Sequence, residues 1–243
     1  MRLLLINPNT TESMTQQMLS AGRAVIGDNV TLEGRTAAYG PVSIEGYYDE
    51  VFSIPPTLEA ISQFGEVDGV IIGCFDDTGV DAARCISDAP VVGLCQAAMQ
   101  AATVVAGTFS VVTTLSRSVP ALEHLAAKYG FASHCRRVRA SEVPVLELEA
   151  PGSEAGVKIR AEIEAALSED GCEAIVLGCG GMSSLARSLS DEFGVPVIEG
   201  VTAAVKLLEG LAAMGVTTSR AGGYAKPSKK DYLGQFSRFA PSK

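Results

Sequence analysis

The sequence has few of the residues and patterns that mark metal, membrane or nucleotide-binding proteins. It contains only two histidines, His124 and His134, and none of its six cysteines forms a Cys-x-x-Cys pair, so a zinc cluster is poorly supported. No apolar stretch reaches the roughly 18 residues that a transmembrane helix needs. The apolar start at residues 1–6 ends at Asn7-Pro8-Asn9, far short of a secretory core. No Walker or Gly-x-Gly-x-x-Gly motif indicates a nucleotide.

Basic residues are also scarce. The chain has 19 Lys and Arg against 28 Asp and Glu, which gives a formal net charge of −9, and it contains no dense basic block. This balance argues against nucleic acid or an anionic membrane surface as a partner. We therefore expect a cytoplasmic protein. With 243 residues, 47% of them hydrophobic and 19% charged, the chain can build one large domain or two smaller ones around a sizeable core.

Two segments of the chain repeat one pattern. Residues 67–98 and residues 172–204 each contain an apolar run that ends in Gly-Cys, a helical segment, a Pro-Val pair and finally Ala-Ala. The two Gly-Cys cysteines, Cys74 and Cys179, lie 105 positions apart, and Pro90 and Pro196 lie 106 apart. The strand-like run before Asn-Pro-Asn-Thr near the start matches the run before Thr-Thr-Leu-Ser at the same offset. These matches predict a duplicated unit.

Each repeat places its cysteine directly after a short apolar run rich in β-branched residues. Residues 70–72 and 175–177 suit strands that are buried on both faces of a parallel sheet. In open α/β sheets the ligand crevice lies off the carboxyl ends of the strands, where the next helix presents its N-terminal N–H groups. The two halves can therefore offer Cys74 and Cys179 to a shared cleft from opposite sides.

The pattern predicts an α/β fold made of two pseudo-symmetric, doubly wound (Rossmann-like) domains with the active site in the cleft between them. We expect the first domain to comprise residues 1–102 plus 205–243, and the second to comprise residues 103–204. The offset between the repeats, rather than any linker, supports this division.

Other polar residues near strand ends allow two interpretations. Asn9 and Thr10 follow the first strand and are either substrate contacts or only turn and capping residues. Asp76 and Asp77, after Cys74, could form a general acid/base pair, but two acids before a helix are more often caps. The remaining cysteines are expected to be small buried hydrophobes; they stand at positions 85, 95, 135 and 172.

Three further segments carry structural expectations. Residues 39–48 contain glycine and proline and indicate a loop, after which Pro55 and Pro56 are expected to start a helix that runs through Phe64. His124 is expected on the outer part of a helix from Pro120 to Tyr129. The tail from residue 217 to residue 243 has four aromatic residues, so we expect it to pack against the body of the protein.

The chain resembles the aspartate/glutamate racemase superfamily, and within it the hydantoin racemase branch, which includes allantoin racemases. The likeness spans nearly the whole chain and rests on ordered motifs: INPNT, IIGCFDDTG, VVTTLSRSVP, KYGF, LGCGGM, VPVIEGVTAA and TSRAGGYAKP. It implies two similar α/β domains around the active site, a C-terminal helix that returns to the first domain, and a homo-oligomer. By position, Cys74 and Cys179 match the two family cysteines that deprotonate and reprotonate a carbon acid without a cofactor.

The resemblance also implies cleft-lining positions and a small-molecule substrate. Asn9, Thr113, Thr114 and the Gly180 backbone match such positions, and Thr10 and Phe75, beside them, complete the candidate substrate-binding set. Relatives that act on free aspartate or glutamate typically have Cys-Asn-Thr or Cys-Thr-Glu, whereas this chain has Cys-Phe-Asp and Cys-Gly-Gly.

The chain departs from the hydantoin branch at two places. Thr78 stands where proline is usual, and Cys95-Gln96-Ala97-Ala98 replaces a usual Glu before Ala-Ala. Both thiols are intact, so the reaction is expected to be retained while the identity of the substrate stays open.

Two thiols suit racemisation because inversion of a stereocentre takes a proton from one face and returns one to the other. A helix N-terminus is expected to lower the cysteine pKa from about 8.5 toward physiological pH. Backbone N–H groups near Gly180 and Thr114 would stabilise the carbanion's oxygen, so neither metal nor cofactor is expected. The expected substrate is a 5-substituted hydantoin or allantoin, deprotonated at C5. The alternatives are an amino-acid racemase, a one-cysteine decarboxylase or isomerase, and a binding module, which would have no reason for matched cysteines.

Overall fold

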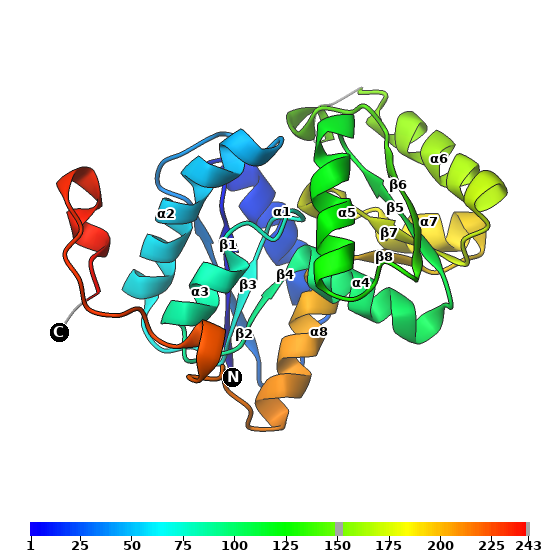
Figure 1. Cartoon of the computed structure of the whole chain (residues 1–243). Helices are drawn as coiled ribbons and strands as arrows, with labels where there is room; N and C mark the ends of the chain where they lie inside the picture. The colour runs from blue at the N-terminus through cyan, green and yellow to red at the C-terminus, as the bar shows by residue number, and fades with distance from the viewer. Residues whose placement is uncertain (149–152, 242–243) are drawn as a thin grey trace.

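The computed structural model describes residues 1–148 and 153–241. Figure 1 shows two α/β halves side by side, each built around one four-stranded sheet. The first half contains β1 (Arg2–Asn7), α1 (Glu12–Arg23), β2 (Thr31–Thr36), α2 (Tyr47–Phe64), β3 (Gly69–Ile72), α3 (Val80–Ile86), β4 (Val91–Gly93) and α4 (Leu94–Val105).

The second half repeats this alternation, with several short helical turns added. It contains β5 (Phe109–Thr113), η1 (Ser116–Ser118), α5 (Val119–Lys128), β6 (Cys135–Ala140), η2 (Val145–Leu148), α6 (Ala155–Ala165), η3 (Ala166–Asp170), β7 (Ala174–Leu177), η4 (Gly180–Met182), α7 (Ala186–Phe193), β8 (Val197–Glu199) and α8 (Gly200–Ala213). The chain ends with two short turns, η5 (Gly222–Tyr224) and η6 (Gly234–Phe239).

The two sheets have the same topology. Their strand orders are β2-β1-β3-β4 and β6-β5-β7-β8, so each strand of the second sheet takes the place of the strand four earlier. All strand pairs are parallel. The strands before the two cysteines, β3 and β7, lie in different sheets. The predicted α/β fold with two pseudo-symmetric halves is therefore confirmed. The residue boundaries stay a prediction, and the one between residues 204 and 205 falls inside α8.

The central strands are buried on both faces, as their continuous apolar runs predict. In β1, Leu3 and Leu5 belong to the large central core, whereas Leu4 and Ile6 belong to the core beneath α2 and α3. This division follows from the strand's period of two. The other half has the same layering, with the outer face of its sheet packed against α6 and α7.

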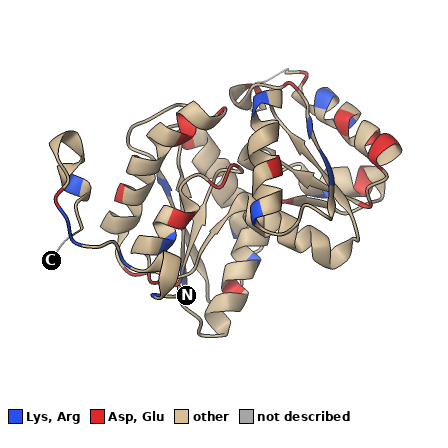
Figure 2. Ribbon diagram, viewed as in Figure 1, with Lys and Arg blue, Asp and Glu red and all other residues tan. Residues whose placement is uncertain are grey.

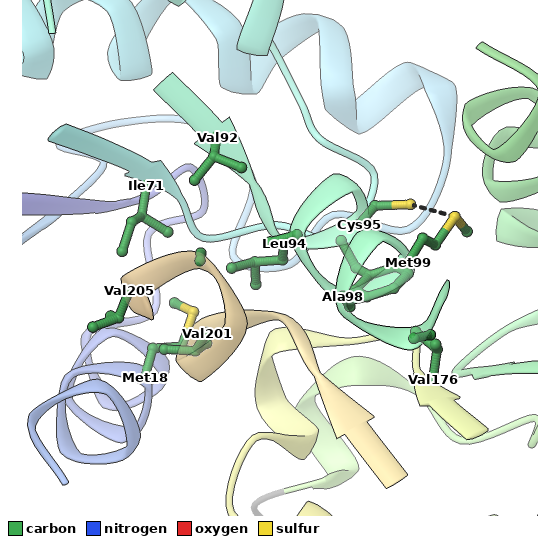
Figure 3. Close-up of a cluster of buried hydrophobic side chains, with 14 of the residues drawn as sticks. Met18, Ile71, Val92, Leu94, Cys95, Ala98, Met99, Val176, Val201 and Val205 are labelled. Atoms are coloured by element: carbon green, nitrogen blue, oxygen red, sulfur yellow. Dashed lines mark hydrogen bonds between the residues drawn. The ribbon is translucent and has the colours of Figure 1, made fainter. Parts of the chain in front are cut away.

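Helices α4 and α8 fill the space between the two sheets. Figure 3 shows residues of α4 between Ile71 of the first sheet and Val176 of the second, all within one hydrophobic cluster. The N-termini of α4 and α8 touch through their backbones: a Cβ on Gly200 would lie 2.4 Å from the Leu94 Cβ and 2.6 Å from the Leu94 carbonyl oxygen. Glycine at this position therefore lets the halves approach closely.

The expected start of α2 at Pro55 is wrong. The helix begins at Tyr47, after Gly46 with a φ of 111°, and it contains both prolines. Two consecutive prolines usually mark a helix start because each lacks a backbone donor. Two acids in the first turn of α2, Asp49 and Glu50, are the local signal for the true N-terminus.

The C-terminal tail packs only in part, so the expectation for it was too strong. Thr218 donates to backbone carbonyls before β4, and Arg220 pairs with Asp88. The tail then runs across α3, where the Tyr224 hydroxyl donates to Asp81 at 3.1 Å (Figure 1). In its last turn, Arg238 donates to the Tyr39 hydroxyl at 2.6 Å and pairs with Glu59 of α2 at 3.6 Å. Leu233 is 86% exposed and Phe236 is 48% exposed.

The charges are mixed along the helices of both halves, with Lys and Arg among Asp and Glu (Figure 2). Among the described helices, none combines the length and the apolar character that a membrane span requires.

Candidate active site

The two candidate cysteines occupy equivalent places at the ends of equivalent strands. Gly73, before Cys74, donates its N–H to a carbonyl of β1 at 2.7 Å, and Gly178, before Cys179, donates to a carbonyl of β5 at 2.8 Å. A Cβ on Gly73 would lie 3.0 Å from that same carbonyl oxygen, and one on Gly178 would lie 2.8 Å from a side-chain atom of β5. Close strand approach therefore requires glycine before each thiol.

Both thiols line one pocket between the halves. Each cysteine is partly buried and neither is in a disulfide. The cavity has a volume of about 40 Å³, which is room for a few water molecules. Its lining consists of Asn9, Met14, Met18, Ile44, Gly73, Cys74, Phe75 and Asp76 from the first half and Thr113, Thr114, Ser118, Val145, Gly178, Cys179, Gly180 and Gly181 from the second.

Asn9 is held in place by a local hydrogen-bond network. Its Oδ1 accepts from the Thr11 N–H at 2.9 Å and from the Asn7 amide at 2.9 Å. Its Nδ2 faces the Met14 sulfur at 3.6 Å, a weak acceptor. The buried Asn7, which the sequence analysis did not single out, thus orients Asn9 so that its amide donor can serve a ligand in the pocket.

The structure separates Thr10 from the other predicted contacts. Thr10 does not line the pocket, because its N–H and its hydroxyl both bind the Pro41 carbonyl, at 3.0 and 3.3 Å. Phe75 lines the pocket and is also part of the central core, with 3% of its surface exposed. We infer that Phe75 shapes the pocket wall.

The predicted residues of the second half meet at the pocket. Thr113 ends β5 and Thr114 follows it, and the Thr113 hydroxyl donates to the Gly178 carbonyl at 2.9 Å, which joins the ends of β5 and β7. Gly180 approaches the first half, since a Cβ there would lie 3.0 Å from the Met18 sulfur. The loop after Cys179 therefore reaches across the pocket.

The prediction that a helix N-terminus lowers the Cys74 pKa is wrong. Helix α3 begins only at Val80, after Gly79 with a left-handed φ of 77°. Burial raises the pKa of Cys74 well above its usual value, and the nearby Asp76 carboxylate raises it further. The Thr78 hydroxyl, 3.5 Å from the sulfur, acts in the opposite direction. At rest, Cys74 therefore favours the thiol form.

Asp77 caps a helix other than the one that follows it. Its carboxylate accepts from the N–H groups of Cys95 at 2.9 Å and Gln96 at 3.0 Å, at the start of α4. It also accepts from the Tyr129 hydroxyl of the second half at 2.8 Å. Burial raises the Asp77 pKa to about 6, while these hydrogen bonds favour the charged form. Capping was the right interpretation for Asp77, but the capped helix is α4 rather than α3.

The second half caps the equivalent amides with a different residue. The Glu199 carboxylate accepts from Val201 N–H at 2.6 Å and Thr202 N–H at 2.7 Å, 106 positions after the amides that Asp77 caps. The position equivalent to Glu199 is Gly93, where a Cβ would lie 2.0 Å from the Asp77 Oδ1. The Asp77 carboxylate therefore occupies the space that a side chain at position 93 would fill.

Asp76 caps neither helix, contrary to the capping interpretation, because its side chain lines the pocket. Burial raises its pKa to about 7, and the neighbouring Glu50 and Asp77 carboxylates add to the effect. Ile44 and Val145 are further lining residues that the sequence did not reveal. Ile44 lies on an irregular segment and Val145 begins η2, and the Val145 N–H donates to Glu45 of the first half at 3.0 Å.

The other cysteines lie outside the pocket. Cys95 and Cys172 are buried, as expected, whereas Cys85 and Cys135 are only partly buried. His124 is exposed, as predicted, near the Tyr47 hydroxyl. In residues 1–148 and 153–241, no cluster of three His, Cys, Asp or Glu side chains could hold a metal ion.

Comparison with known proteins agrees with this arrangement. The pattern of a family described as Asp/Glu/Hydantoin racemase matches residues 3–208. The chain belongs to this family. A hydantoin racemase of Rhizobium meliloti is 48% identical over 237 residues, which cover 96% of this chain and 98% of that protein. A hydantoin racemase of Pseudomonas sp. (strain NS671) is 40% identical, with 98% and 97% covered.

A solved structure of the family is also closely similar. The allantoin racemase from Klebsiella pneumoniae superposes with a TM-score of 0.95 at 44% identity, and 99% of each chain is covered. Both sheets and the layer of helices between them are therefore common to the two proteins.

Proposed function

We propose that the protein is a cofactor-independent racemase that removes and returns the proton at C5 of 5-substituted hydantoins, including allantoin. The observation that carries the proposal is one pocket lined by two thiols, Cys74 and Cys179, from equivalent strand ends of the two halves. The names of the similar proteins, hydantoin racemase and allantoin racemase, support the substrate class.

In this mechanism the two cysteines act on opposite faces of C5. One thiolate takes the proton, and the opposite thiol gives a proton to the other face of the planar carbanion. Because Cys74 favours the thiol form, it is suited to be the donor in the direction in which Cys179 is the base. The roles exchange in the reverse direction.

The carbanion's charge moves onto the adjacent ring carbonyl, which needs hydrogen-bond donors. The Asn9 amide and the backbone around Thr114 and Gly180 line the same pocket and supply such donors.

The lining favours a neutral ring over a free amino acid. None of the described lining residues is Lys, Arg or His, so an α-carboxylate would meet no cationic side chain. The same argument applies to a dicarboxylate substrate of a decarboxylase. A decarboxylase that uses a single cysteine would also leave one of the paired thiols without a role.

Polarimetry with single enantiomers of several 5-substituted hydantoins, allantoin, aspartate and glutamate tests the substrate class. We expect loss of optical rotation with the hydantoins or allantoin and none with the amino acids. Racemisation of glutamate alone would overturn the assignment.

Substitution of each thiol tests the mechanism. Cys74→Ser and Cys179→Ser should each abolish racemisation, because a hydroxyl is far too weak a base to replace a thiolate. Each variant should still exchange the C5 proton with deuterated solvent from one face, with opposite enantiomer preference. Cys135→Ser, outside the pocket, is the matched control and should keep wild-type turnover. Near-normal racemisation by Cys74→Ser would contradict the two-thiol mechanism.

The proposed enzyme is a homo-oligomer. Apolar side chains are exposed on α2, at Tyr48, Val51 and Phe52, and on the tail, at Leu233 and Phe236, and association would cover them. Sedimentation should show a species heavier than the 25.2 kDa chain. A single monomeric species at micromolar concentration would refute this.

A further inference from the structure

Asp76 occupies a position in the pocket that the proposed mechanism does not use. It stands two residues after Cys74, and its main-chain N–H hydrogen-bonds to the Cys74 sulfur. Asp76 is one of the residues that line the cavity that both thiols share, and the residue as a whole is half-buried. Its neighbour Asp77 is turned away to cap α4. The two adjacent acids thus face different surroundings, and only Asp76 can act on a ligand.

The surroundings of Asp76 do not neutralise its charge. The groups that act on its carboxyl are two further carboxyls, Glu50 of α2 and Asp77 of its own loop, while Cys74 lies beside it. One oxygen of Glu50 is buried without a hydrogen-bond partner. Among the described lining residues, Asp76 is the sole carboxylic acid, and none is basic. Above its pKa of about 7, Asp76 is ionised, and its field extends into the pocket, where burial limits screening by water.

We propose that Asp76 is a charge filter that disfavours substrates with an anionic group next to the reacting carbon. The proposal rests on the proposed function, which places that carbon between Cys74 and Cys179. Any group bonded to it then lies within a few ångströms of Cys74 and of the Asp76 carboxylate. Two like charges about 6 Å apart in a partly buried site repel strongly, but an acid with a pKa of about 7 relieves the repulsion by taking up a proton. At pH 8 the effect on relative rates is therefore limited to about tenfold.

Two hydantoins of nearly equal shape test the filter by turnover. We compare 5-(carboxymethyl)hydantoin, which carries a carboxylate, with 5-(carbamoylmethyl)hydantoin, which carries a neutral amide. At pH 8, about one unit above the Asp76 pKa of about 7, wild-type enzyme should prefer the amide in kcat/KM, and Asp76→Asn should reduce this preference by about three- to tenfold. Glu147→Gln, which removes an exposed carboxylate near the pocket, should leave both rates and their ratio unchanged. An unchanged preference in Asp76→Asn would refute the filter.

Alkylation tests the same charge without turnover. The thiolate sulfur bonds to the CH₂ of iodoacetate or iodoacetamide and iodide leaves, so the two reagents differ mainly in charge. The iodoacetamide-to-iodoacetate rate ratio at Cys74 and Cys179 at pH 8, read by mass spectrometry of peptides, should fall by about three- to tenfold in Asp76→Asn. Changes in thiol pKa cancel in this ratio because both reagents need the thiolate. Cys85, outside the pocket, is the internal control.

The two experiments separate the filter from the proposed function. If wild-type enzyme racemises neither hydantoin but the alkylation ratio falls as expected, the racemase assignment fails and the filter stands. If the amide is racemised and neither ratio responds to Asp76→Asn, the filter fails and the racemase stands. A ratio that falls equally at Cys85 would show a general effect of net charge and would also overturn the filter.

Discussion

Replacement of Asp76 by Asn should stabilise the protein at alkaline pH. The folded protein raises the Asp76 pKa from 3.8 to about 7, first through burial and then through the carboxylates of Glu50 and Asp77. A raised pKa means that the folded state holds a proton that the unfolded state releases as pH rises above about 4. Stability is therefore lost between pH 4 and pH 7, and the loss is complete above the folded pKa.

The size of the loss follows from the two pKa values. The difference between 3.8 and about 7 corresponds to about 4 kcal/mol, at about 1.4 kcal/mol for each tenfold change in proton affinity. Because the residue is only half-buried, we expect a loss of about 2 to 4 kcal/mol. Asn has nearly the same shape and cannot ionise, so Asp76→Asn should recover this free energy at pH 8 and little of it at pH 4.

Urea unfolding of wild-type protein and Asp76→Asn at pH 4, 6 and 8 measures the effect. The free-energy difference should grow with pH, and the melting temperature at pH 8 should rise by roughly 5 to 10 °C. Glu147→Gln, at an exposed carboxylate, should show a small difference that does not change with pH. A variant less stable than wild type at pH 8, or a difference that is the same at all three pH values, would refute the reasoning.

Two further predictions concern the cap on α4. Gly93→Ala would place a Cβ 2.0 Å from the Asp77 Oδ1 and displace the cap, so the free energy of unfolding should fall by about 2 to 4 kcal/mol. The control Gly223→Ala, with open space around it, should change the free energy of unfolding by less than about 0.5 kcal/mol. Equal effects of the two substitutions in thermal unfolding would contradict the steric argument. Tyr129→Phe removes the hydroxyl that donates to Asp77 and should lower the free energy of unfolding by about 1 to 2 kcal/mol at pH 8. The loss should be smaller at pH 5, below the Asp77 pKa of about 6, because the hydrogen bond to the ionised carboxylate is the stronger one. The same loss at both pH values in urea unfolding would show that the charge of Asp77 is not involved.

The sequence predicts the fold well because the relevant signals are local. The apolar runs before Cys74 and Cys179 are short, β-branched and buried on both faces in the structure, as parallel strands require. Glycine before each thiol follows from the close approach of neighbouring strands. The equal spacing of these signals then predicts two equivalent halves, and the structure places both thiols on one pocket.

The features that the sequence does not predict depend on contacts between distant segments. The Cys74 pKa is set by burial and by Asp76, which outweigh any helix N-terminus. The partner of Asp77 is a helix that starts 17 residues later, because β4 brings that helix back to the loop. The start of α2 was missed because Pro55 is a stronger local signal than the acids of the first turn.

Helices α4 and α8 are capped by different residues, Asp77 and Glu199, and this difference constrains how two copies of one unit can diverge. A side chain such as Glu199 at position 93 leaves no room for the Asp77 carboxylate, whereas glycine there without Asp77 leaves two amides of α4 uncapped, at a cost of about 1 kcal/mol. A change at position 93 or a change at Asp77 is therefore unfavourable alone, and each becomes favourable once the other is present. Transplantation of the Cys74 loop into the second half would therefore require Glu199→Gly in the same step. An enzyme redesigned from two identical halves would have to carry one type of cap throughout. With the Glu199 type it would lose the hydrogen bond by which Tyr129 ties the second half to the loop beside the first thiol.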